Sequence, residues 1–199
     1  MPLPPFLERD ARPLLQEGAP PKRLTGLANT RTHERLNLSA NVPLQEEDHW
    51  CWAAVTVGVA CFFGVSSWRQ CEIASLVLKR ACCPPRSNAF CNVEQALEPP
   101  LDTAGHLNSS IAGSQSFAYV RDQLKANRPV CCRIQWRPTG GHFLVLVGIT
   151  DNDTQYVDVS DPWYGPSTIA FPEFVSNYFG SGFWNWTYET KPRSKRRSA

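Results

Sequence analysis

Within residues 41–190 the hydrophobic pattern changes once, near Pro129, and that change limits the fold more than any single motif. Before Pro129, apolar residues recur at helical spacing between capping residues and prolines. After it, β-branched and aromatic residues form short runs separated by turn residues, as in antiparallel strands. Helices followed by strands predict an α+β fold, with a cleft where the two halves meet.

Local signals place the expected elements. A buried helix should begin at Cys51, in the run CWAAVTVGVACFFG, and end at Gly64. Further helices are expected at about 68–79 (capped by Ser66 or Ser67), 93–97, 117–126 and 173–178. Strands are expected at 130–136, 142–150, 155–160, 167–171 and 183–190.

Composition divides the chain into three parts. Residues 1–40 are rich in proline and arginine and show no sustained periodicity, which predicts a poorly ordered leader. Residues 41–190 hold all the expected elements and form the predicted domain. Residues 191–199, which begin KPRSKRR, form a basic tail.

Charge and hydropathy exclude several classes of protein. The formal net charge of +2 is too small for a dedicated nucleic-acid binder. The longest apolar run, residues 55–63, falls far short of the roughly 18 residues that a membrane span needs. The N-terminus opens MPLPPFLERDARP, where a Sec-type signal needs an apolar stretch. We therefore expect secretion or export by a non-Sec route.

Cys51 is the candidate nucleophile, because it is the first residue of the expected buried helix. The positive end of a helix dipole favours a thiolate, which is the reactive form of cysteine. The backbone N–H of Cys51 can also bind a developing oxyanion. Gln45 lies on the loop just before Cys51 and can supply a second oxyanion donor through its side-chain amide.

His142 is the best candidate for a general base among the four histidines of the chain. It follows Gly140-Gly141 and opens an apolar strand, so it should stand at a strand end facing the cleft. An orienting carboxylate is expected on the adjacent strand. Asp161, in Ser160-Asp161-Pro162-Trp163, is favoured over Asp158, which lies one strand turn earlier.

Taken in order, Gln45, Cys51-Trp52-Ala53, Gly141-His142 and Asp161-Pro162-Trp163 resemble the papain-like cysteine protease superfamily. The likeness covers about residues 42–190 and is greatest to compact bacterial members, the staphopain-like enzymes and type III effector proteases. It implies a two-lobed fold, with a helical lobe carrying the nucleophile helix packed on a C-terminal antiparallel sheet. It also implies Gln45 as oxyanion donor, Cys51 as nucleophile, His142 as base and Asp161 where papain has Asn. Trp163 matches the aromatic residue that shields the histidine in that family.

The other seven cysteines fall into two groups. Cys61, Cys131 and Cys132 are expected to be small core residues. The second group lies near the prolines that follow Cys83 and favours two disulfides. One would join Cys71, and the other Cys91, to the adjacent pair Cys82-Cys83. Free thiols remain an alternative, and zinc is a weaker one because no Cys-x-x-Cys knuckle is present. The four residues of this group are Cys71, Cys82, Cys83 and Cys91.

These features predict a cysteine peptidase that acts on proteins or peptides and needs no metal or organic cofactor. Its own leader is a candidate substrate, since leaders are removable pro-segments in many relatives. The same triad can instead perform acyl transfer, deamidation or isopeptide cleavage in a toxin or effector. A disulfide-stabilised binding module with a silent triad is the non-enzymatic alternative.

Overall fold

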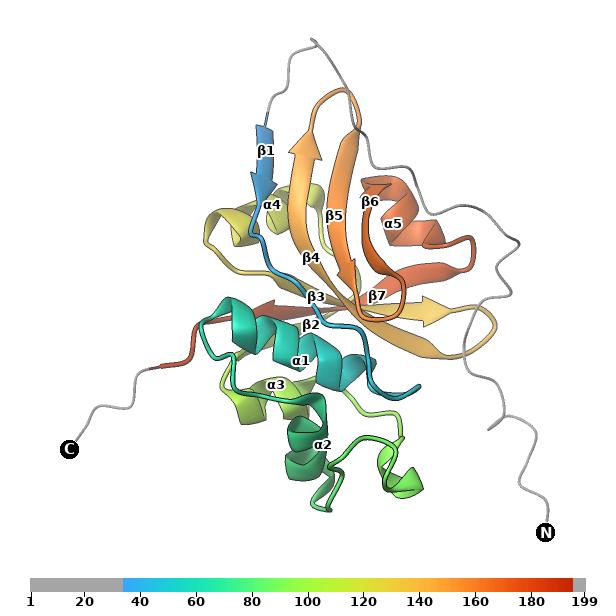
Figure 1. The fold of residues 1–199 in the computed structure, drawn as a ribbon. Helices are drawn as coiled ribbons and strands as arrows, with labels where there is room; N and C mark the ends of the chain where they lie inside the picture. The colour runs from blue at the N-terminus through green and yellow to red at the C-terminus, as the bar shows by residue number, and fades with distance from the viewer. Residues whose placement is uncertain (1–33, 195–199) are drawn as a thin grey trace.

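The computed structural model describes residues 34–194 and confirms the α+β class (Figure 1). Within this range the helices are α1 (Cys51–Phe62), α2 (Gln70–Leu78), the 3-10 helix η1 (Ala89–Cys91), α3 (Glu98–Ala104), α4 (Phe117–Lys125) and α5 (Phe171–Asn177). The strands are β1 (Glu34–Asn37), β2 (Leu107–Ala112), β3 (Val130–Trp136), β4 (Gly141–Asp151), β5 (Gln155–Asp161), β6 (Gly165–Ala170) and β7 (Gly182–Thr190). None of these helices combines the length and apolar character needed to cross a membrane.

All the described strands belong to one antiparallel sheet, in the order β2-β7-β3-β4-β5-β6. β4 is the longest strand and pairs with β3 over its first half. β1 then pairs with the end of β4, from Glu34 opposite Asp151 to Asn37 opposite Gly148. β4 therefore runs through the middle of the sheet, with its first residue at the edge where the helices approach.

Two hydrophobic cores cover the two faces of this sheet. On one face, α1, α2 and α3 pack against side chains such as Phe143, Val145 and Val147 of β4. On the other, α4 and α5 pack against Leu144 and Leu146, which alternate with the first set along the strand. Figure 1 shows α1–α3 grouped in the lower half of the view, beneath the curved sheet. The helical part thus lies against the sheet, as the resemblance implies.

α1 is buried along almost its whole length, which explains its apolar sequence on every side. Gly58 permits this close packing, because a Cβ there would lie 2.8 Å from the backbone of Val42. Cys61 is exposed, so its predicted place in the core is wrong. It lies four residues after the half-buried Val57, on the side of the helix that α2 and the sheet leave uncovered.

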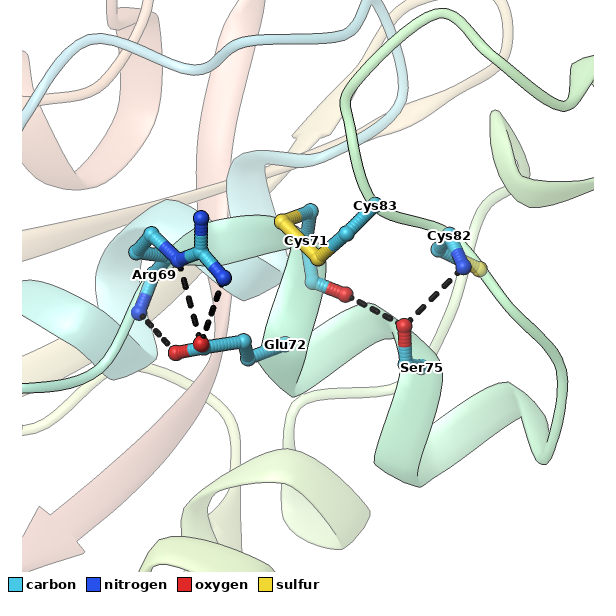
Figure 2. Close-up of polar contacts among 6 residues, drawn as sticks. All are labelled: Arg69, Cys71, Glu72, Ser75, Cys82 and Cys83. Carbon is cyan, nitrogen blue, oxygen red and sulfur yellow. Dashed lines mark hydrogen bonds and ion pairs between the residues drawn. A yellow bond between two sulfur atoms is a disulfide. The ribbon is translucent and has the colours of Figure 1, made fainter.

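Two disulfides fix the segment after α2, as the cysteine pattern predicts, and Figure 2 shows the one between Cys71 and Cys83. They join Cys71 to Cys83 and Cys82 to Cys91. The hydroxyl of Ser75 connects them, since it donates to the carbonyl of Cys71 at 2.7 Å and accepts from the N–H of Cys82 at 3.0 Å. The vicinal cysteines are therefore bound to α2 by covalent and hydrogen bonds together.

α2 begins at Gln70, two residues later than predicted, because the cap is not a serine. Glu72 accepts a hydrogen bond of 3.0 Å from the backbone N–H of Arg69, which is the cap residue. Its other oxygen accepts a hydrogen bond of 2.7 Å from the Arg69 guanidinium (Figure 2). A carboxylate in the first turn also favours this end of the helix dipole.

Between residues 93 and 112 the structure differs from the prediction. The short helix expected at 93–97 is irregular chain, and α3 forms directly after it from Glu98. Pro99 and Pro100 lie in the first turn of α3, where a missing N–H costs nothing. Strand β2, with sequence LNSSIA, carries a weak strand signal and forms by pairing with β7.

Most of the predicted leader lies outside the described residues, but its last part belongs to the sheet as β1. Asp158 holds this strand through a hydrogen bond of 3.1 Å from the side-chain amide of Asn37. Gly148 allows the close approach, because a Cβ there would lie 2.5 Å from Asp158 Oδ2 and 2.7 Å from the Leu36 carbonyl. Residues 34–37 are thus an integral edge of the domain.

Candidate active site

A cavity of about 390 Å³ lies where the first residue of α1 faces the first residues of β4. Cys51 and Trp52 line it from α1, and Gly141 and His142 line it from β4. The remaining walls come from the loop before α1, the irregular segment at 94–96, Arg133 and aromatic residues of the sheet, and the turn after β5. The cavity therefore joins the two halves of the chain, as the change of pattern near Pro129 predicts.

Cys51 lies at the N-terminus of α1, half-buried and not in a disulfide. The cap residue is Trp50, and no side chain caps this end of the helix. The first hydrogen bond of the helix runs from the N–H of Ala54 to the carbonyl of Trp50. The N–H groups of the first turn are thus left for a ligand, and the helix dipole favours negative charge on the sulfur.

His142 lies between Cys51 and Asp161. Its Nε2 atom is 2.8 Å from Oδ1 of Asp161, so Nδ1 is the ring nitrogen that remains for the sulfur. Burial alone would lower the pKa of His142, but the Asp161 carboxylate and hydrogen bonds to Asp161 and Cys51 raise it to about 10. The ring stacks against Trp136, with centroids 6.2 Å apart. These contacts favour an imidazolium in a fixed orientation.

Asp161 is completely buried, and its carboxylate accepts four hydrogen bonds. Oδ1 accepts from His142 and from the backbone N–H groups of Trp163 and Tyr164, at 2.7 and 3.0 Å for the last two. Oδ2 accepts from the hydroxyl of Tyr178 at 2.8 Å. Burial would raise the pKa of Asp161, but the charge and hydrogen bonds of His142 hold it below its usual value. Asp161 is therefore an anion, and His142 Nε2 must carry the proton between them.

Tyr178 is the residue of this site that the sequence did not indicate. It follows α5, is fully buried, and lies 17 positions from the carboxylate that it binds. Burial and the Asp161 charge raise the pKa of Tyr178 well above its usual value, so the phenol stays protonated and donates. The only sequence signal was a tyrosine in an apolar segment, since a buried tyrosine needs a partner for its hydroxyl.

Asp158, the alternative orienting group, does not contact His142. Its two oxygens bind the hydroxyl of Thr168 at 2.7 Å and the amide of Asn37 at 3.1 Å. Asp158 and Asp161 are three residues apart on one strand, so their side chains point to opposite faces of the sheet. The carboxylate beside the base is therefore Asp161.

Gln45 lies on the loop before α1, and its side chain does not line the cavity that contains Cys51 and His142. Its amide nitrogen donates to the carbonyl of Glu47 at 2.8 Å and to that of Asp48 at 2.6 Å. These bonds use both of its N–H groups. In this conformation Gln45 fixes the turn that leads into Cys51. Binding an oxyanion would require one of the two bonds to be exchanged.

The disulfide-bonded segment supports the loop and helix around Cys51. The indole of Trp50 donates to the carbonyl of Cys91 at 2.7 Å, and the indole of Trp52 donates to the carbonyl of Val93 at 3.0 Å. Between these two, the N–H of His49 donates to the side chain of Asn92 at 2.9 Å. The residues before and after Cys51 are thus bound to the chain that the Cys82–Cys91 disulfide holds.

Among residues 34–194, no group of three or more His, Cys, Asp or Glu side chains is arranged to hold a metal ion. Cys131 and Cys132 are buried, and burial raises the pKa of both thiols. Neither is therefore a second nucleophile. The chemistry that the described site offers is that of one thiol, one imidazolium and one carboxylate in a line.

The model of one protein family, described as papain-like cysteine protease AvrRpt2, matches residues 32–179. The match begins just before β1 and ends just after Tyr178, so it includes Cys51, His142 and Asp161. The α+β architecture agrees with a papain-like fold. No curated protein matches the chain.

Proposed function

Because the chain belongs to the papain-like cysteine protease AvrRpt2 family, a family of bacterial effector proteases, we propose that it is a cysteine peptidase with Cys51 as nucleophile. The observation that carries this proposal is the line from Cys51 through His142 to Asp161, with 2.8 Å between His142 Nε2 and Asp161 Oδ1. Its substrates are proteins or peptides.

In the first half of the reaction, the Cys51 thiolate attacks the carbonyl carbon of the scissile peptide bond. The backbone N–H of Cys51 stabilises the resulting oxyanion, and the Gln45 amide joins it after leaving one of its two carbonyl partners. The His142 imidazolium then donates its Nδ1 proton to the leaving amine, which breaks the C–N bond and leaves a thioester on Cys51.

In the second half, neutral His142 removes a proton from water, and the hydroxide oxygen attacks the thioester. The C–S bond breaks, the carboxylic acid product leaves, and Cys51 and His142 are again a thiolate and an imidazolium. Asp161 keeps its negative charge throughout and holds the ring by Nε2. Tyr178 in turn restrains Asp161 from its other oxygen.

A peptidyl epoxysuccinate tests whether Cys51 is an activated nucleophile. We expect stoichiometric modification of Cys51 near neutral pH, measured by mass spectrometry of the labelled peptides. Cys61 is the matched control, because it is an exposed free thiol outside the cavity. Cys61→Ala should leave the labelling unchanged, whereas His142→Ala should abolish it. Equal labelling of Cys51 and Cys61 would contradict the proposal.

Peptide-bond hydrolysis is tested separately from nucleophilicity. The protein is incubated with a denatured protein mixture, and the new N-termini are sequenced. We expect new N-termini with wild type and none with Cys51→Ala. A reactive Cys51 that produces no new N-termini would assign the site to acyl transfer or deamidation instead.

We also propose that the leader is removed before β1 and that the protein is secreted or translocated, as its membership of an effector family suggests. Support for the position of cleavage comes from β1, since its pairing with β4 ties residues 34–37 to the domain. A shortened species that begins near or before residue 34 in wild type, and is missing in Cys51→Ala, is the expected result. The same shortened species in Cys51→Ala would assign the cut to another protease.

A further inference from the structure

Arg133 brings a positive charge into the wall of the cavity that contains Cys51 and His142. It lies in β3 opposite Phe143, the residue that follows the base on β4. None of the ion pairs among residues 34–194 includes Arg133. A guanidinium is charged at every relevant pH, so the cavity holds a permanent cation without a carboxylate partner in the described chain.

Neutral groups hold this guanidinium by one nitrogen only. Nη1 donates to Oε1 of Gln135 at 2.8 Å and to Oδ1 of Asn185 at 3.1 Å, which uses both of its hydrogens. Nη2 and Nε make no hydrogen bond within the described residues. Two amide oxygens thus fix the side chain and leave three N–H groups for another acceptor.

Gly141 provides the space that the guanidinium occupies beside the base. A Cβ at Gly141 would lie 2.6 Å from Nη2 of Arg133 and 2.9 Å from its Cζ. Any other residue at this position would push the arginine out of its place. The guanidinium therefore lies against the backbone directly before His142, within reach of a substrate bound at Cys51.

The acidic residues of the cavity come from its helical wall, whereas Arg133 comes from the sheet. Asp48 belongs to the loop before α1, and Glu94 belongs to the irregular segment before α3. Both are exposed, and no ion pair among residues 34–194 joins either of them to Arg133. A substrate carboxylate would be repelled from that wall and attracted to the sheet side, so the two walls together give it one place to bind.

We propose, on the basis of the proposed peptidase function, that Arg133 selects substrates with a carboxylate close to the scissile bond. Nη2 and Nε present two parallel N–H groups, the arrangement that a carboxylate accepts in a bidentate manner. The carboxylate is that of an Asp or Glu side chain or of the substrate's own C-terminus. Arg133 is thus a specificity-determining residue and takes no part in the chemical steps.

The test begins with the wild-type full chain and a peptide library that varies each position around the cleavage site. Pairs of peptides are then compared that differ only by Glu or Gln at the position where an acidic residue is most strongly preferred. We expect the Glu peptide to have a kcat/KM about 10- to 100-fold higher, as one charge-assisted pair allows. Each pair is also assayed with a free and an amidated C-terminus, which separates the two sources of the carboxylate.

Substitutions assign the preference to the residue. Arg133→Gln should remove the difference in kcat/KM between the Glu and Gln peptides. Arg133→Glu should instead favour a peptide with Lys at the same position. Arg133→Lys should retain part of it, because a lysine keeps the charge but not the bidentate geometry. Arg137→Gln is the matched control, since Arg137 is exposed and lies outside the cavity wall.

The outcomes separate this inference from the proposed function. Cleavage of Glu, Gln and amidated peptides at equal rates by wild type would overturn the role of Arg133 and leave the peptidase in place. An acidic preference that survives in a folded Arg133→Gln would overturn it as well. If Arg133→Gln does not fold, the wild-type comparison and Arg133→Lys still decide. No cleavage of any peptide by wild type would overturn both proposals.

Discussion

The hydroxyl of Tyr178 donates a hydrogen bond of 2.8 Å to Oδ2 of Asp161, the carboxylate oxygen that His142 leaves free. His142 binds the other oxygen, also at 2.8 Å. The carboxylate is therefore held from both sides, and the backbone N–H groups of Trp163 and Tyr164 fix it further. Restraint of this kind keeps the imidazole aimed at Cys51 without any motion of the carboxylate.

Tyr178→Phe removes only the hydroxyl that binds Asp161. We expect kcat to fall about 10-fold with little change in KM, and the free energy of unfolding to fall by about 1–3 kcal/mol, because a buried carboxylate oxygen loses its donor. Steady-state kinetics and urea denaturation measure the two effects. Tyr156→Phe, on β5 and outside the site, is the control and should change neither. An unchanged kcat in Tyr178→Phe would show that Asp161 needs no support from this side.

Asp161 and Asp158 should respond differently to loss of their charge. Asp161→Asn is expected to lower kcat/KM by about 10- to 100-fold, because His142 loses the negative charge that favours the imidazolium while an amide oxygen still orients the ring. Asp158→Asn should leave kcat/KM within about threefold and lower stability by about 1–2 kcal/mol through β1 and β6. A peptide-cleavage assay and thermal unfolding of both variants provide the comparison. The reverse ranking in kcat/KM would assign the orienting role to Asp158.

The protonation of His142 should persist into alkaline solution. Its pKa is raised from 6.5 to about 10, since the Asp161 charge outweighs burial. The charge on His142 therefore stabilises the fold fully below pH 6.5, and this contribution is lost as the pH rises toward 10. NMR titration of the His142 ring measures the pKa. Asp161→Asn should move it down, because burial is then opposed only by the interactions with Cys51. A pKa near 6.5 in both proteins would contradict the coupling.

Gln45→Ala separates the two roles open to this side chain. If Gln45 is an oxyanion donor, its replacement should lower kcat by about 10²- to 10³-fold, with KM nearly unchanged. We expect this loss in addition to a decrease in stability from the two bonds to Glu47 and Asp48. Single-turnover kinetics with a peptide substrate measure the first effect, and thermal unfolding measures the second. A loss of stability with kcat within threefold would restrict Gln45 to fixing the loop.

The two disulfides should affect activity unequally. Replacing Cys82 and Cys91 by alanine should lower stability by about 2–4 kcal/mol and also lower kcat, because the carbonyl of Cys91 accepts from Trp50 beside the nucleophile. Replacing Cys71 and Cys83 should give a similar loss of stability with a smaller loss of kcat. Unfolding and kinetic assays of the two double variants make the comparison. Equal loss of kcat would indicate a general loosening of α2 rather than an effect through Trp50.

Much of the fold follows from local sequence. The helix that begins at Cys51, the strand that opens with His142 and the strand that ends with Asp161 all lie where hydrophobic periodicity and turn residues predict them. Elements with weak local signals were missed: β2 has two serines in its centre, and β1 has four residues with one aliphatic side chain. Both form because a neighbouring strand offers hydrogen-bond partners, and that partner lies far away in the sequence.

By itself, the sequence determined which residue types stand at helix and strand ends, and hence the order of Cys51, His142 and Asp161. Only the tertiary structure decided the distant partners: Tyr178 on Asp161, Asn37 on Asp158 and Asn185 on Arg133. The physical reason is that periodicity and capping act over a few residues. Strand register and the packing of α1 on the sheet instead set contacts across 17 to 121 positions, as in the bonds of Asp161 to Tyr178 and of Asn37 to Asp158.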